Sequence, residues 1–381
     1  MQTLRYMATS AFGLESVVKR EAANMGFKDL KVSDGRVCFD AGLEALPKAN
    51  LRFRCAERVL LVLGEFTALS FDDLFEGVKA LPWEQWITKD GRIAVTGSSV
   101  QSRLYSVSDC QSIIKKAIVE RLKLTYKTRW FDETGPEYKI RAALLRDVAS
   151  ITLDTSGAGL HKRGYRAVAG DAPLKETLAA ALVSLSYWRK DRVLLDPVCG
   201  SGTICVEAAM IAKNIAPGLS RKFSAEEWPQ IDSKLWKDAR KEAYAAIDVN
   251  FRPEIYGSDI DERVIEIAKA NASKAGVDDC ARFERKPLED VTLPKDYGVA
   301  ICNPPYGERL GLSEEIEKLY KDMGGIFGAN KTWSFYALTN CEYFEKLYGR
   351  RADAKRKIYN GGMKTDFYQF YGERPARGHL T

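Results

Sequence analysis

A short glycine-containing segment, LLDPVCGSGT, offers the first chemistry in this sequence. It runs from an apolar strand pattern into Asp196 and then through Gly200 and Gly202, which let the backbone approach a ligand without a Cβ clash. A phosphate-binding loop would need a lysine before its Ser or Thr, and a dinucleotide-binding loop would need a third glycine; the segment has neither. For a glycine pair taken alone, a tight strand-to-helix turn without any ligand stays open.

Two acids favour S-adenosylmethionine as the ligand of this turn. Asp259, in GSDID, is expected to end the second strand of the same sheet and to accept hydrogen bonds from both hydroxyls of a ribose. Asp196 suits the ammonium and sulfonium charges of S-adenosylmethionine, whereas it would repel a pyrophosphate. Taken alone, Asp259 could also be a solvated acid at a strand end. The candidate cofactor-binding residues are Asp196, Cys199, Gly200, Ser201, Gly202, Thr203, Asp259 and Ile260.

A second motif, Asn303-Pro304-Pro305-Tyr306, follows the apolar strand pattern GVAIC and is expected at the same edge of the sheet. Its prolines alone are typical of a loop that stops strand pairing, but they do not explain the flanking Asn and Tyr. An exocyclic amine on a base is a weak nucleophile because its lone pair is delocalised into the ring. Hydrogen bonds from that amine to the Asn303 side-chain oxygen and the Pro304 carbonyl would favour a pyramidal, reactive nitrogen.

The other two residues of the motif would hold the base and the backbone. Tyr306 could stack on the base, a contact of about 1–3 kcal/mol. Pro305, with Pro304, would keep the backbone rigid, which in-line transfer of a methyl group requires. All four residues, Asn303 to Tyr306, are therefore the candidate catalytic residues.

These motifs need elements to position them, and the sequence predicts two kinds. After a cluster of Gly, Pro and basic residues at 159–176, helix and strand patterns alternate, which predicts a parallel, doubly wound α/β sheet. Ligands bind beyond the carboxyl ends of such strands. The earlier residues mix strands and helices and predict α+β domains with largely antiparallel sheets. They include a hairpin turning at Asp34-Gly35 and a long helix with Asp109 as its N-cap.

The composition limits the class of protein. With 381 residues, of which 45% are hydrophobic and 29% charged, the chain is long enough for two domains and is typical of soluble globular proteins. Its net charge of +6 suits a nucleic-acid partner without establishing one. Eight cysteines form no CxxC pair and only two histidines are present, so we expect free thiols and no metal site. Without a signal-peptide pattern or an apolar run of about 20 residues, we expect a cytoplasmic protein without membrane contact.

Three basic segments could contact RNA phosphates. The first lies on the predicted long helix, the second is HKRGYR at the domain boundary, and the third is GRRADAKRK near the C-terminus. Each segment taken alone is more commonly a solvated face than a binding site. The candidate RNA-binding residues are Lys115, Lys116, Lys162, Arg163, Arg166, Arg356 and Lys357.

The motifs DPVCGSGT, GSDID and NPPYGERL resemble those of class I methyltransferases that act on amino groups of nucleobases. Together with LHKRGYR and APLKETLAAAL, they resemble bacterial THUMP-domain methyltransferases of the 23S rRNA guanine-N2 family, often labelled N6-adenine-specific DNA methylases. The resemblance covers almost the whole chain. It implies a ferredoxin-like region at 1–57, a THUMP RNA-binding domain at 58–160 and a Rossmann-like methyltransferase domain at 161–381. Lys286 departs from it, because many relatives have an acid there that contacts the adenine amine.

The resemblance implies an S-adenosylmethionine-dependent RNA methyltransferase. Its substrate would be a guanine of 23S rRNA, or of a ribosomal precursor, flipped into the site and methylated at N2. Adenine-N6 methylation of RNA or DNA is the alternative, because other methyltransferases share NPPY. A third hypothesis is an RNA-binding assembly factor with an inactive methyltransferase domain; the presence of Asp196, Asp259 and Asn303 speaks against it.

Overall fold

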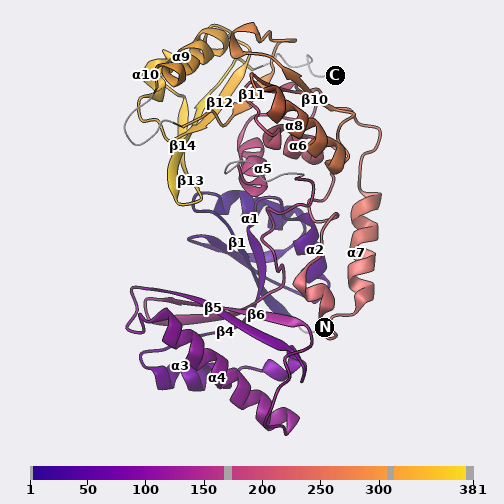
Figure 1. Ribbon diagram of the computed structural model, residues 1–381, viewed down its shortest axis with the longest axis vertical. Coiled ribbons are helices and arrows are strands. Elements are labelled where there is room, and N and C mark those ends of the chain that lie inside the picture. Colours follow the sequence, from indigo (N-terminus) through magenta and orange to yellow (C-terminus); the bar gives the residue numbers. More distant parts are fainter. Residues whose placement is uncertain (1–2, 167–173, 307–312, 375–381) are drawn as a thin grey trace.

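The computed structural model describes residues 3–166, 174–306 and 313–374. The molecule is elongated, with one seven-stranded sheet built from the first part of the chain and a second seven-stranded sheet built from the rest (Figure 1). We call residues 4–154 the first unit and residues 176–370 the second unit. The predicted change from an α+β region to an α/β region is confirmed, and the second unit carries both motif segments.

The first unit is one sheet in the order β2-β3-β1-β4-β7-β6-β5, in which only β5 and β6 pair in parallel. The hairpin between β2 and β3 turns at Asp34-Gly35 as predicted, with Ser33 paired to Arg36. The bounds are β1 (Leu4–Thr9), α1 (Glu15–Asn24), β2 (Lys28–Ser33), β3 (Arg36–Ala41), α2 (Ala45–Arg52), β4 (Arg58–Thr67), α3 (Phe71–Lys79), β5 (Arg92–Val100), α4 (Val107–Tyr126), β6 (Glu137–Leu145) and β7 (Val148–Asp154).

A single long strand, β4, joins the two halves of this sheet. Its first five residues, Arg58–Val62, pair with β1, while Leu60–Thr67 pair with β7 on the other side. Alternate residues along these strands point to opposite faces. One face, with Tyr6 and Leu61, is buried in the core, and α1, α2, α3 and α4 contact the sheet or one another around it. The other face, with Met7 and Leu60, carries a hollow that is lined by strand and turn residues rather than by helices.

The second unit is a sheet in the order β10-β9-β8-β11-β12-β14-β13. The five strands β10, β9, β8, β11 and β12 run parallel to one another. At one edge, β14 pairs antiparallel with β12, and β13 pairs antiparallel with β14. The bounds are α5 (Glu176–Leu185), β8 (Leu194–Asp196), α6 (Thr203–Ala212), α7 (Ser233–Ala245), β9 (Ile255–Asp259), α8 (Glu262–Ala275), β10 (Ala281–Arg285), β11 (Val299–Cys302), α9 (Glu314–Met323), β12 (Ser334–Thr339), α10 (Phe344–Tyr348), β13 (Ala354–Asn360) and β14 (Met363–Phe370).

Helices cover both faces of the second sheet, as a doubly wound sheet requires. One face packs with α5, α6 and α8 into the large core, to which Leu194 and Ile301 belong. The other packs with α9 and α10 into a separate aromatic cluster, to which Leu195 and Cys302 belong. Adjacent residues of β8 and β11 thus pack into opposite cores, so both strands are apolar except for Asp196 at the end of β8.

One predicted detail is wrong. The long helix α4 begins at Val107 with Ser106 as its N-cap, and Asp109 lies within the first turn. An acid in the first turn is still favourable there, because it interacts with the positive end of the helix dipole. The eight cysteines are all free, and all except Cys38 are buried. Across the described residues, no helix combines the length and the apolar character that a membrane span needs.

Candidate active site

Three predicted polar residues come together at one edge of the second sheet. β8 pairs in parallel with β9 on one side and with β11 on the other. Asp196 ends β8, Asp259 ends β9, and Asn303 directly follows β11. Because the carboxyl ends of neighbouring parallel strands meet at the same edge of the sheet, these cofactor-binding and catalytic candidates lie at adjacent strand ends.

The glycine turn after β8 is fixed to the end of β9. Gly200 and Gly202 have φ values of +50° and +76°, a region that favours glycine. The Gly200 N–H donates to a carboxylate oxygen of Asp259 at 3.0 Å, and the Cys199 N–H donates to the Ser258 carbonyl at 2.9 Å. A Cβ atom on Gly200 would meet nothing within 4 Å, so the backbone there borders open space, as a ligand's close approach requires.

Two residues that the sequence did not single out shape this turn. A Cβ atom on Gly202 would come within 2.7 Å of the Phe283 ring on β10 and within 2.9 Å of the Ala268 Cβ on α8. Asn271, also on α8, donates its side-chain amide to the Ser201 carbonyl at 3.0 Å. The only signal in the sequence was that Asn271 interrupts the apolar face of a predicted helix; Phe283 gave none.

The carboxylates of the site differ in their surroundings. Asp196 is 2% exposed, and burial raises the pKa of its carboxyl well above the usual value, with Asp259 adding to the shift. Asp259 accepts from the Gly200 and Asp261 backbone N–H groups, one on each oxygen, which leaves further lone pairs for ribose hydroxyls. Ile260 is 67% exposed beside it, so an apolar surface is available to a ligand. Burial raises the pKa of the Cys199 thiol, which therefore stays neutral.

Asn303 already has a hydrogen-bond donor in this structure. The Tyr306 hydroxyl donates to the Asn303 side-chain oxygen at 2.5 Å, and the Asn360 amide donates to the Tyr306 oxygen at 3.4 Å. Burial raises the pKa of Tyr306 to about 12, so the phenol is protonated and can donate. The oxygen predicted to accept from a substrate amine is therefore occupied by a neighbouring side chain.

Two further residues, also missed from the sequence, anchor the backbone of the motif. Tyr320 on α9 donates its hydroxyl to the Pro305 carbonyl at 2.9 Å and lies 3.0 Å from the Thr339 hydroxyl on β12. Tyr320 is fully buried, so its ring is fixed by packing. The remaining residues of NPPYGERL, 307–310, lie outside the described residues, as do residues 167–173 of the predicted boundary segment.

Comparison with known families identifies three consecutive parts of the chain. An RlmL ferredoxin-like domain matches residues 5–60, a THUMP domain matches residues 68–154, and an RMKL-like methyltransferase domain matches residues 163–369. The chain belongs to the RMKL-like methyltransferase family. The predicted family and fold class are thereby confirmed. The predicted boundaries after residues 57 and 160 stay predictions.

The relatives of this RMKL-like methyltransferase include proteins of similar and of double length. It is 48% identical to "Putative RNA methyltransferase YpsC" of Bacillus subtilis (strain 168), over 99% of this chain and 98% of that protein. It is 36% identical to the ribosomal RNA large subunit methyltransferase K/L of Psychromonas ingrahamii, over 98% of this chain. That match covers 51% of the relative, so the chain spans about half its length.

Solved structures match over nearly the whole chain. The structure described as a predicted N6-adenine-specific DNA methylase from Listeria monocytogenes is 48% identical, with a TM-score of 0.93, and covers 98% of this chain and 97% of that one. SMU.472, which was solved as a complex with SAH, is 44% identical, with a TM-score of 0.93, and covers 99% and 100%. The arrangement of the two units is thus shared with relatives.

Two of the predicted RNA-binding residues have structural roles in the methyltransferase domain. Arg163 is 2% exposed and forms an ion pair with Glu207, which is fully buried on α6. A guanidinium enclosed in this way cannot reach a phosphate backbone, so its prediction is wrong. Arg166 is partly exposed, pairs with Glu176 at 3.1 Å and donates to the Thr203 hydroxyl at 3.2 Å, so it supports the start of α6, and its contact with RNA stays a prediction.

The other predicted RNA-binding residues stay predictions. In the THUMP domain, Lys115 pairs with Glu133 at 2.9 Å, and Lys116 lies 5.9 Å from the centre of the Phe75 ring. Arg356 on β13 donates to the Ser16 hydroxyl on α1 and so links the methyltransferase and ferredoxin-like domains. Lys162 and Lys357 are exposed, and within the described part of the chain neither forms an ion pair.

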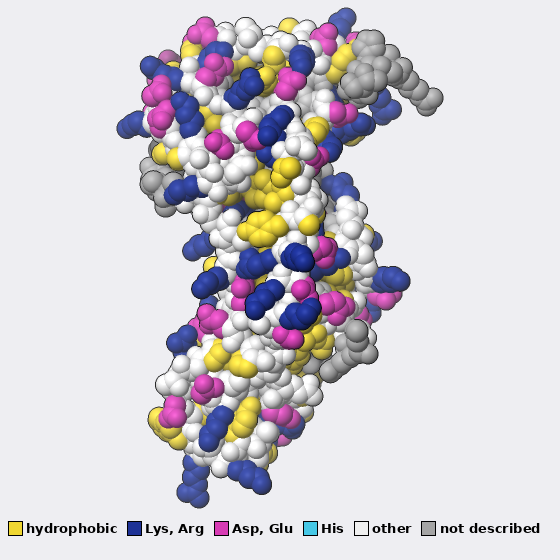
Figure 2. Space-filling model, turned by 90° about the vertical axis from the view of Figure 1, so that its right-hand side faces the viewer, with side chains coloured by type: hydrophobic (Ala, Val, Ile, Leu, Met, Phe, Trp, Pro, Cys, Tyr) yellow, Lys and Arg dark blue, Asp and Glu magenta, His cyan; other side chains and the backbone are white. Residues whose placement is uncertain are grey.

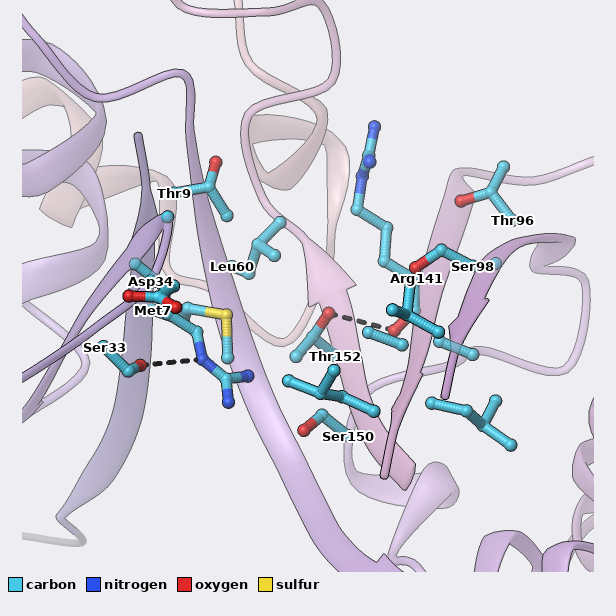
Figure 3. A pocket seen from close by; sticks show the side chains of 18 of the residues that line it. Met7, Thr9, Ser33, Asp34, Leu60, Thr96, Ser98, Arg141, Ser150 and Thr152 are labelled. Atoms are coloured by element: carbon cyan, nitrogen blue, oxygen red, sulfur yellow. Dashed lines mark hydrogen bonds between the residues drawn. The ribbon is translucent and has the colours of Figure 1, made fainter. Parts of the chain in front are cut away.

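A hollow of about 650 Å³ lies on the helix-free face of the first sheet (Figure 3). Met7 and Leu60 form part of its floor, and hydroxyls such as that of Thr152 line it. Its three arginines are engaged: Arg141 pairs with Asp154 at 3.0 Å, Arg36 lies 3.8 Å from Glu65, and Arg146 donates to the Gln101 side-chain oxygen at 3.3 Å. Among the described residues, no group of three or more His, Cys, Asp or Glu could hold a metal ion.

Proposed function

We propose that this methyltransferase uses S-adenosylmethionine to methylate the exocyclic N2 of a guanine in 23S rRNA or a ribosomal precursor, in the cytoplasm. The observation that carries the proposal is the meeting of Asp196, Asp259 and Asn303 at the carboxyl ends of three adjacent parallel strands. The first two suit the two ends of the cofactor, and the third suits an amine that needs a hydrogen-bond acceptor. The bound SAH of SMU.472 supports the cofactor.

The Asn303 side-chain oxygen has two lone pairs, so it can accept from a target amine beside the Tyr306 hydroxyl or in its place. A target amine entering the site would use the Asn303 oxygen and the Pro304 carbonyl as acceptors. The amine lone pair would form the new N–C bond as the S–C bond of S-adenosylmethionine breaks, which would release SAH, and the cationic nitrogen would then lose its proton to solvent water. Where its hydroxyl is displaced, the Tyr306 ring is free to stack on the base. Such an exchange would couple entry of the base to assembly of the site.

The relatives support an RNA substrate. Both K/L relatives that match here, from Psychromonas ingrahamii and Photobacterium profundum, are named ribosomal RNA large subunit methyltransferases, and YpsC is named as an RNA methyltransferase. THUMP and ferredoxin-like domains precede the methyltransferase domain in this chain and would hold the RNA. A guanine in a duplex would have to be extruded, because its N2 atom is otherwise out of reach.

Adenine-N6 methylation is the second candidate, because the Listeria structure is described as a predicted N6-adenine-specific DNA methylase. Both reactions need an acceptor for an exocyclic amine, so Asn303 serves either. Lys286 follows β10, which is separated from β11 and Asn303 by β9 and β8, and it pairs with Glu284 at 2.6 Å, so it does not discriminate between the two substrate amines. Mass spectrometry of rRNA nucleosides from a strain without the protein separates them: loss of N2-methylguanosine supports the proposal, and loss of N6-methyladenosine instead supports the second candidate.

The role of Asn303 is tested by replacing it with alanine. If its oxygen bonds more strongly as charge develops on the amine, Asn303→Ala should lose about 10²–10³-fold in single-turnover methyl transfer. The affinity for S-adenosylmethionine and the melting temperature should stay near the wild-type values. Tyr306→Phe is the matched variant, because it keeps the stacking ring and removes only the hydroxyl, and it should retain most of the turnover. A wild-type rate for Asn303→Ala would end the catalytic assignment.

A further inference from the structure

A second hollow, of about 410 Å³, lies where the two units meet. Residues of α1, α2 and the segment after α2 form one wall, and residues from the ends of α5 and α6 and from α7 form the other. α2 packs against α7 and α1 against α5 around it. Figure 2 shows Lys and Arg side chains gathered at mid-height on the face that carries α7. We call this hollow the junction pocket.

Positive charge dominates the junction pocket. Its lining includes the cations Arg20, Lys48, Arg52 and Arg54 and only two carboxylates, those of Glu21 and Glu242. Arg52 pairs with Glu242 at 3.3 Å, and Arg20 donates to the neutral Ser184 carbonyl at 2.7 Å. Burial raises the pKa of Glu21, which weakens its negative charge further. Among the described residues, no carboxylate lies within 4.0 Å of the charged nitrogens of Lys48 or Arg54.

Arg54 gives the clearest sign of a missing anion. One of its terminal nitrogens, Nη1, is buried and has no hydrogen-bond partner among the described residues. Burial lowers the pKa of Arg54, and the negative charges of Glu207 and Glu21 offset this loss of hydration only in part. A buried charged donor without an acceptor is destabilising, and an oxyanion would supply both the acceptor and the opposite charge.

We propose that the junction pocket binds a phosphoryl group, held by Lys48 and Arg54. A guanidinium and an ammonium that line the same pocket can together match several oxygens of a phosphate. The hollow on the first sheet is the weaker candidate, because Arg36 and Arg141 lie near acids and Arg146 donates to the Gln101 side-chain oxygen. Figure 3 shows the hydroxyl side chains that line the same hollow. The phosphoryl group could belong to the RNA backbone, which rests on the proposed function, or to a small free phosphate. In either case it would bridge the ferredoxin-like and methyltransferase domains.

The first test uses inorganic phosphate and pyrophosphate alone, titrated into the whole protein at low salt without RNA or S-adenosylmethionine. Wild type should bind one of these anions, and Lys48→Gln should weaken the binding about tenfold or more, as expected for a lost charge-assisted contact. Lys19→Gln is the matched control, because Lys19 is an exposed lysine of α1 that does not line the pocket. Arg54→Met should act like Lys48→Gln, and melting curves check that each variant folds.

The second test binds a ribosomal RNA transcript to the same variants. Weaker RNA binding by Lys48→Gln than by Lys19→Gln assigns the phosphoryl group to RNA; equal RNA binding, with weaker anion binding, assigns it to a small phosphate. The proposal is overturned if neither anion nor RNA distinguishes Lys48→Gln from Lys19→Gln. Because the anion titration needs no methyl transfer, a failure of the proposed function leaves its result intact.

Discussion

Asp196 is a carboxyl group placed where it is costly to charge. It is 2% exposed, its side chain accepts one backbone hydrogen bond, from Val198 at 3.3 Å, and a second carboxylate, Asp259, lies nearby. Its folded pKa is raised, so the stability it contributes is present at low pH and is lost as the pH rises through that pKa. A bound cation would reverse the preference, because it stabilises the carboxylate.

Cofactor affinity should therefore depend on pH through Asp196. As the pH rises through the raised pKa, the carboxylate forms and S-adenosylmethionine, with its ammonium and sulfonium groups, should bind more tightly. Asp196→Asn should bind more weakly at high pH and should show a flatter profile. Calorimetric titrations across the acidic to neutral range measure this. A profile for Asp196→Asn as steep as that of wild type would show that another group controls binding.

Part of the site could be predicted from the sequence. Asn303 and Asp259 could be placed because strand ends are readable from apolar runs, and parallel strands bring their ends together. The contact of Tyr306 with Asn303, and of Asn360 with Tyr306, could not, because it depends on how the β13–β14 hairpin reaches the motif. Short polar side chains on separate elements leave no mark in the spacing of a sequence.

The glycine turn between β8 and α6 depends both on its backbone conformation and on its packing against α8 and β10. Gly202 has φ = +76° and lies against Phe283 and Ala268, whereas Gly276 at the end of α8 has φ = +70° and faces open space. The order of strands and helices around this turn was predictable from alternating patterns. The N-cap of α4 was not, because several residues near a helix start can serve as caps and propensity alone does not choose between Ser106 and Asp109.

These two glycines make a matched pair of substitutions. Gly276→Ala should lower the free energy of unfolding by about 1–2 kcal/mol, the cost of a left-handed alanine. Gly202→Ala should cost about 1–3 kcal/mol more, because its methyl group would crowd Phe283 and Ala268. Urea unfolding of both variants measures the difference. Equal losses would mean that the ring and α8 move aside without cost.

One buried ion pair connects three parts of the molecule, which are helix α6, the segment before α5 and the ferredoxin-like domain. Glu207 on α6 accepts from Arg163 and, at 3.1 Å, from the Tyr165 hydroxyl. Arg163 also donates to the Leu160 carbonyl at 2.7 Å and to the Arg54 carbonyl of the ferredoxin-like domain. A basic run such as HKRGYR looks the same in a sequence whether it faces RNA or a buried acid, and Glu207 lies far along the chain. The sequence therefore predicts RNA contact for Arg163, whereas the structure pairs it with Glu207.

Removal of Arg163 should be costly for folding. Arg163→Ala leaves Glu207 buried and unpaired, and should lower the free energy of unfolding by about 3–5 kcal/mol. Arg163→Met combined with Glu207→Leu should recover part of the loss, because the buried carboxylate leaves together with its partner, while Arg54 loses the countercharge of Glu207. Lys162→Ala is the neighbouring control and should change stability by less than about 0.5 kcal/mol. Denaturant unfolding measures the stability of each variant. A loss for Arg163→Ala as small as that for Lys162→Ala would contradict a structural role of the Arg163–Glu207 pair.

The shared strand β4 has a consequence for how the protein can be divided. Because β4 pairs with β1 on one edge and β7 on the other, a cut before Arg58 would separate two partners of one continuous sheet. One fragment would then expose the edge of β1, and the other the first five residues of β4, with unpaired N–H and C=O groups that are a template for self-association. The ferredoxin-like and THUMP domains therefore share one sheet and should be expressed together.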